Sequence, residues 1–171
     1  MRARRLALVV ALLVAAVVTQ LSVLSSLVPT GVVPDLALVV VVAVGLSSGA
    51  VDGAWAGFVG GLLLDAAPPA DHVLGQWTLA LTVAGYLAGT VDRGSRPSWT
   101  SDMITVAAGS FVATSLFALS GLVLAQPGVR LPEAVPVIAL AVLYDSVLGL
   151  AVVPAVRSLL GRVEPAPRAG W

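Results

Sequence analysis

The stretch LALVVALLVAAVVTQLSVLSSLV, residues 6–28, contains no ionisable side chain and directly follows a basic cluster formed by Arg2, Arg4 and Arg5. A helix needs about 20 apolar residues to cross a hydrocarbon core about 30 Å thick. The stretch is longer than the apolar region of an ordinary signal peptide, which has about 7–15 residues. We therefore interpret it as a retained signal-anchor helix of an integral membrane protein.

The composition of the whole chain agrees with this class. Of the 171 residues, 58% are hydrophobic and only 11% are charged, whereas about 25% are charged in ordinary soluble domains. The mean hydropathy is +1.03. The chain contains no cysteine, which excludes disulfides, thiol nucleophiles and thiolate metal sites.

Apolar runs separated by turn-forming residues predict an all-α membrane protein. We expect one compact bundle of six transmembrane helices within residues 1–160, followed by a short cytoplasmic tail at 161–171. The predicted spans are about 6–28, 35–50, 53–67, 73–91, 103–125 and 135–153. The division near residues 47–52 is the weakest, because the second and third segments are both short. They can also be read as one broken re-entrant hairpin.

The distribution of arginine predicts the orientation. The chain has nine arginines and no lysine. With six crossings and a cytoplasmic N-terminus, eight arginines fall on the cytoplasmic side and only Arg130 falls outside, as the positive-inside rule expects. The sequence therefore predicts a multi-pass protein of the cell inner membrane with both termini in the cytoplasm. Arg157, Arg162 and Arg168 are expected near the lipid headgroups.

Glycines recur at four-residue intervals in the predicted helices. Gly53, Gly57 and Gly61 fall on one helical face, and Gly85 and Gly89 repeat the interval in the next helix. In lipid, small residues at this spacing let two helix backbones approach closely. Two readings are open: packing between helices of this chain, or a docking face for a partner's transmembrane helix.

Two aspartates lie within the predicted spans, Asp65 near the end of the third and Asp145 well inside the sixth. A carboxylate at mid-bilayer costs about 2.5–3.5 kcal/mol on insertion scales, so both should face the bundle interior. We expect Thr78, Gln76 and Ser146 as hydrogen-bonding partners. Each aspartate is either a proton or ligand site or a buried polar clamp that fixes helix register.

Catalytic, cofactor and metal-binding motifs are not evident in the sequence, and we expect neither an enzyme nor a cofactor or metal. The only histidine, His72, lies in a predicted loop. Six acidic residues mark predicted helix ends, where solvation explains them: Asp35, Asp52, Asp92, Asp102, Glu133 and Glu164. No basic patch points to nucleic acid.

From Pro34 to Gly89 the sequence resembles the MreD family of rod shape-determining proteins. The resemblance rests on Pro34-Asp35-Leu36, then on the run GAWAGFVGGLLLD at 53–65, and then on LALTVAGYLAG at 79–89. The positions that match the family pattern are Pro34, Asp35, Gly57, Gly61, Asp65, Gly75, Gly85, Tyr86 and Gly89. Asp145 and the loop at 93–100 do not match it clearly.

The resemblance implies a non-enzymatic scaffold of the bacterial cell-elongation machinery, which builds peptidoglycan and regulates cell shape. Proteins of this family associate with MreC. Through MreC they contact the wall synthase complex of transpeptidase and glycosyltransferase and, where present, the actin-like MreB. The family fold is similar to the six-helix S component of energy-coupling-factor vitamin transporters.

Two other functions remain open. The first is a substrate-binding S component of a vitamin transporter, for which Ala3, Ala7, Ala11 and Ala15 provide a small-residue face on the first helix. The second is a proton-coupled carrier that uses Asp65 and Asp145, although no internal repeat typical of such carriers is evident.

Overall fold

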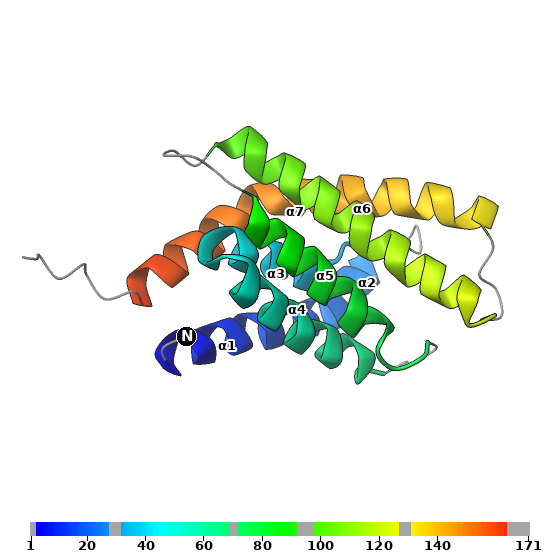
Figure 1. Cartoon of the computed structure of the whole chain (residues 1–171), viewed down its shortest axis with the longest axis horizontal. Helices are drawn as coiled ribbons and strands as arrows, with labels where there is room; N and C mark the ends of the chain where they lie inside the picture. Colours follow the sequence, from blue (N-terminus) through cyan, green and yellow to red (C-terminus); the bar gives the residue numbers. More distant parts are fainter. Residues whose placement is uncertain (1–2, 28–31, 69–71, 92–97, 127–130, 164–171) are drawn as a thin grey trace, which may run out of the picture.

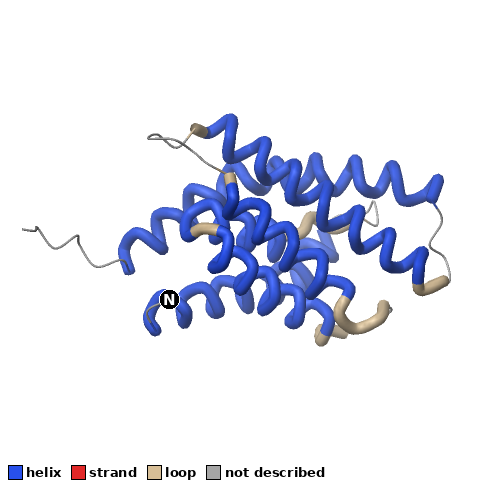
Figure 2. The backbone as a smooth tube through the Cα atoms, in the orientation of Figure 1, coloured by secondary structure: helices blue, strands red, loops and turns tan. Residues whose placement is uncertain are grey.

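The computed structural model describes residues 3–27, 32–68, 72–91, 98–126 and 131–163. Within these residues the protein is all-helical and contains no strand, as Figure 2 shows. The elements in chain order are α1 (Ala3–Thr19), η1 (Gln20–Leu24), α2 (Ser25–Leu27), α3 (Leu36–Ser48), α4 (Ala50–Asp65), α5 (Gln76–Thr90), α6 (Trp99–Val123) and α7 (Leu131–Val163). Because α1, the π-helical η1 and α2 are continuous, the described residues form six helices, the predicted number.

Three helices are long and apolar enough to cross a membrane. They cover Ala3–Leu24, Trp99–Val123 and Ala134–Val163. The helices α3, α4 and α5 have 13, 16 and 15 residues, which correspond to about 20–24 Å at 1.5 Å per residue. The bundle therefore combines three helices with the length of a membrane span and three shorter ones.

Helix α3 is the centre of the bundle. It contacts α1, α4, α5, α6 and α7, and every residue from Ala37 to Leu46 is buried. Its sequence, LALVVVVAVGLSS, is apolar all round, a pattern typical of a helix surrounded by other helices or by lipid. Figure 1 shows α3 between α1 on one side and α6 and α7 on the other.

Helices α3 and α4 form a hairpin with a single connecting residue. Gly49 is both the C-cap of α3 and the N-cap of α4 and has φ +93° and ψ 175°, a conformation that is favourable only for glycine. The predicted division at 47–52 is therefore a break between two separate helices. The predicted start of α4 at Gly53 was three residues late.

The end of α7 differs from the prediction. The sixth span was expected to end at Val153, and a tail was expected from Gly161, but α7 continues to Val163. Pro154 lies inside the helix, where its ring removes a backbone hydrogen bond and bends the axis. Figure 1 shows the second half of α7 turning toward α1. Buried Val153, Val156 and Leu160 belong to the core, which explains why the helix persists.

Both described ends of the chain lie at the same end of the bundle, as Figure 1 shows. At this end Arg5 donates a hydrogen bond to the Ser48 hydroxyl, and the Arg157 guanidinium pairs with Asp102 at 2.8 Å. The interpretation of Asp102 as a simply solvated helix end was therefore wrong. It was also wrong for Asp35, which is buried. Some of the predicted positions lie outside the described residues: those of Arg2, Arg93, Arg96, Arg130 and Arg168, and those of tail residues 164–171.

Candidate functional site

The glycines of the predicted packing faces meet one another inside the bundle. A Cβ atom added at Gly53 would overlap the carbonyl group of Gly85, and one at Gly57 would overlap the backbone of Leu81. A Cβ at Gly61 would lie 2.5 Å from the carbonyl oxygen of Trp77. These contacts bring the backbones of α4 and α5 together along their whole length.

The same seam continues to the α3–α4 turn. Gly89 lies against the backbone of Gly49 and Ala50, and a Cβ at Gly45 would lie 2.6 Å from the Gly85 carbonyl oxygen. We call the close contact of these glycines the glycine seam. Because α5 already covers the glycine face of α4, this face is not open to a partner's helix. The reading of Gly53, Gly57, Gly61, Gly85 and Gly89 as a docking face is therefore wrong.

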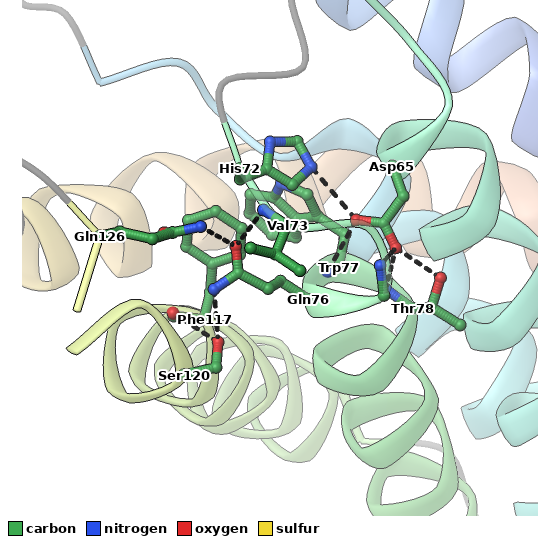
Figure 3. Close-up of polar contacts among 10 residues, drawn as sticks. Asp65, His72, Val73, Gln76, Trp77, Thr78, Phe117, Ser120 and Gln126 are labelled. Carbon is green, nitrogen blue, oxygen red and sulfur yellow. Dashed lines mark hydrogen bonds and ion pairs between the residues drawn. The ribbon is translucent and has the colours of Figure 1, made fainter. Parts of the chain in front are cut away.

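Asp65, the last residue of α4, caps the beginning of α5. Its carboxylate accepts hydrogen bonds from the backbone N–H groups of Gly75 at 2.8 Å, Trp77 at 3.1 Å and Thr78 at 3.0 Å. The Thr78 hydroxyl donates to it at 2.6 Å. The first N–H groups of a helix have no partner within the helix, and here a side chain from the preceding helix satisfies them. Figure 3 shows this arrangement.

The contact of His72 with Asp65 was not predicted from the sequence. Its Nε2 lies 3.1 Å from a carboxylate oxygen of Asp65, and its ring packs edge-on against Phe117 at 5.5 Å between centroids. Phe117 also stacks on Trp77 at 4.4 Å. The sequence did contain a signal for this contact: His72 lies only seven positions after Asp65.

Gln76 was predicted as a partner of Asp65, and this was wrong. Its side-chain oxygen accepts from the Val73 N–H and from Gln126, and its amide donates to the Ser120 hydroxyl at 3.0 Å. Gln76 therefore joins the start of α5 to the end of α6 (Figure 3).

Asp145 lies at the centre of a second polar group, which joins four helices. The Asp145 side chain is fully buried. One carboxylate oxygen accepts from the Asp35 backbone N–H at 2.7 Å, and the other accepts from the Ser110 hydroxyl at 2.6 Å. The predicted partner, Ser146, instead donates to the Val142 carbonyl within α7.

The remaining members of this group surround the first turn of α3. The Asp35 carboxylate accepts from the Leu38 N–H at 2.9 Å as an N-cap, and the Gln20 side chain accepts from the Ala37 N–H at 3.1 Å. Gln20 is the first residue of the π-helical η1, and such widened turns are frequent at functional sites. We call Gln20, Asp35, Ser110 and Asp145 the central polar cluster.

The other residues of the family-like pattern have distinct positions. Gly75 is the N-cap of α5 with φ +103°, which suits glycine. Pro34 is buried, and its carbonyl accepts from Leu36 at 3.2 Å. Tyr86 is half exposed on the outer side of α5.

Two features of the outer surface are relevant to partners. A groove of about 370 Å³ lies between α5 and α6, and its lining includes Ala84, Ala88, Ala108 and Gly109. On α1, the face formed by Ala3, Ala7, Ala11 and Ala15 is exposed.

Comparisons with protein-family models, with curated proteins and with solved structures found no match. Over the residues that the structure describes, the fold is that of an all-helical protein with three helices of membrane-spanning length and composition.

Proposed function

We propose that this protein is a non-enzymatic membrane scaffold of the MreD type, which binds the transmembrane helix of MreC through its helix bundle. In this role it would link MreC to the wall synthase complex during cell elongation. All six helices would be embedded in the inner membrane, with both termini in the cytoplasm.

One observation carries the proposal: the residues of the MreD-like pattern occupy the positions that hold α3, α4 and α5 together. Asp35 caps α3, and Asp65 with Gly75 organises the start of α5. Gly57 and Gly85 lie in the glycine seam. A match confined to exposed or exchangeable positions would carry much less weight, because apolar membrane helices resemble one another by composition.

The arrangement of the charged residues supports the proposed orientation. Arg5 and Arg157 lie at the same end of the bundle, next to Ser48 and Asp102. Positive side chains are enriched on the cytoplasmic side of membrane proteins. The short helices α3, α4 and α5 would cross the bilayer only if it is thinned locally or if flanking residues extend to the headgroups, and both responses to mismatch are common.

With the glycine seam closed, the groove between α5 and α6 is the surface we assign to the MreC helix. Its floor contains alanine and glycine, which let another helix approach closely in lipid. Leu87, Val91 and Ile104 line its margins and would provide van der Waals contacts with apolar side chains of the partner.

Co-purification of MreC with the full-length chain in mild detergent tests both parts of the proposal. Ala108→Trp fills the groove and should reduce the amount of bound MreC by about tenfold, equivalent to about 1.4 kcal/mol. Ala11→Trp, on the exposed face of α1, is the matched control and should leave binding unchanged. Normal binding by Ala108→Trp would exclude the groove, and no binding by the wild type would contradict the scaffold role.

The exposed alanine face of α1 favours the alternative function, a vitamin transporter S component. Such a face lets a coupling subunit pack closely against the helix. Native mass spectrometry of the purified protein separates the two functions. A stoichiometric small molecule that is retained through purification would favour transport, whereas retention of MreC would favour the scaffold.

A further inference from the structure

The central polar cluster contains a buried carboxylate oxygen without a hydrogen-bonding partner. Asp35 is 5% exposed, and its Oδ1 accepts from the Leu38 N–H. Its Oδ2 is buried and makes no hydrogen bond. Leaving a charged oxygen in this state is costly, because burial of a polar group without a hydrogen bond costs several kcal/mol in an apolar medium.

Asp145 presents the opposite situation. Both of its oxygens accept a hydrogen bond, from the Asp35 N–H and from the Ser110 hydroxyl. Donors directed at both oxygens stabilise the ionised form of a carboxylate. The two aspartates therefore share one cluster but have unequal environments. Both carboxylate oxygens of Asp145 accept a hydrogen bond, whereas Oδ2 of Asp35 accepts none.

Among the described residues, no basic side chain belongs to the cluster, and the charged groups on the surrounding helices are engaged or directed elsewhere. Asp65, on α4, accepts from the start of α5, and Asp102, on α6, pairs with Arg157 of α7. Tyr144 is about 100° round α7 from Asp145. The other titratable residues described on these helices lie toward the opposite end of the bundle or on its outer surface: Arg4, Arg5, Asp52, Tyr86 and Arg162.

Two carboxylates that share a buried site without a cation do not both ionise, because their negative charges repel in a medium of low dielectric. We propose that Asp35 and Asp145 form a proton-binding site in the centre of the bundle, in which Asp35 Oδ2 holds the proton and Asp145 carries the negative charge. The proton exchanges with water, and no other reactant is required. This inference is independent of the scaffold role.

Infrared spectroscopy of the purified full-length protein tests the site directly. At about pH 7, where an unperturbed aspartate is ionised, the wild type should show the C=O stretching band of a protonated carboxylic acid. Labelling with ¹³C-aspartate should shift this band, which would assign it to aspartate. Asp35→Asn should abolish the band, and the control Asp52→Asn should retain it.

Thermal stability provides a second measurement. The amide of Asp35→Asn keeps an oxygen for the Leu38 N–H and places a neutral group where the protonated oxygen lies, so this variant should fold and melt within a few degrees of the wild type. Absence of an aspartic acid band in the wild type would overturn the proposal. So would a band unchanged in Asp35→Asn, or failure of that variant to fold.

Discussion

At the scale of single residues, the buried aspartates Asp65 and Asp145 accept hydrogen bonds from the first backbone N–H groups of helices. Asp65 takes the N–H groups at the start of α5, and Asp145 takes one at the start of α3. Both carboxylates come from a different helix than the one they cap. The first N–H groups of a helix have no partner within the helix, so these side chains position the helix ends as well as stabilise them.

Asp65→Asn should destabilise the protein by about 1–3 kcal/mol. Three backbone N–H groups and one hydroxyl donate to the Asp65 carboxylate, and the amide of asparagine keeps only one acceptor oxygen, so some of these four donors lose their partner. The measurement is the loss of helical signal on heating in detergent. Asp52→Asn, in the first turn of α4, is the control and should change stability by no more than about 0.5 kcal/mol. Equal stability of the two variants would show that the Asp65 cap is dispensable.

The burial of both aspartates was predicted correctly from the sequence, but the partners of Asp145 were not. Ser146, the next residue in the sequence, was expected, whereas the actual donors are the Asp35 backbone N–H and the Ser110 hydroxyl, which are separated from Asp145 by 110 and 35 positions. Adjacent positions on a helix point about 100° apart. Thr78 was predicted correctly for Asp65, since a short loop joins their helices.

At the scale of helices, the glycine seam determines how closely α4 and α5 pack. Because glycine has no side chain, backbone carbonyl groups of α5 lie in direct contact with the backbone of α4 at Gly53 and Gly57. Glycine is among the poorest helix formers, by about 1 kcal/mol relative to alanine, and the close packing compensates for this cost. The interval of four residues predicted the faces, but it does not distinguish a neighbour in the same chain from one in another protein.

Gly57→Ala should cost about 3 kcal/mol, the upper part of the usual range for overpacking, because the new methyl group meets the rigid backbone of Leu81. Gly161→Ala is the matched control. Its Cβ would meet nothing within 4 Å, so this variant should gain about 0.5–1 kcal/mol from helix propensity. Both are measured by thermal unfolding, and equal stability of the two variants would exclude a structural role of the seam.

At the scale of the whole molecule, the prediction of six helices is confirmed for the described residues, but the position of α3 in the centre was not predicted. Valine and leucine are equally suited to lipid and to a protein interior, so hydropathy alone does not place α3 away from lipid. The extension of α7 beyond Pro154 was missed for a related reason: Val156 and Leu160 stabilise it through tertiary contacts, which override the local effect of proline.

Labelling of single cysteines tests the proposed orientation, since the native chain contains none. Gly161→Cys, near the end of α7, should react with a membrane-impermeant maleimide only after the cells are permeabilised. Ala66→Cys, exposed at the opposite end of the bundle, should react in intact cells. The reverse pattern would place the termini outside the cytoplasm and contradict the assigned topology.

The first turn of α3 has a consequence for biogenesis. Asp35 leaves the ribosome long before Asp145, 110 residues later, and before Ser110. Until α7 has been synthesised, the backbone N–H of Asp35 lacks the Asp145 carboxylate that accepts its hydrogen bond in the folded protein. We therefore expect the newly made N-terminal half to remain sheltered by the insertion machinery, and a chain truncated after α5 to be degraded.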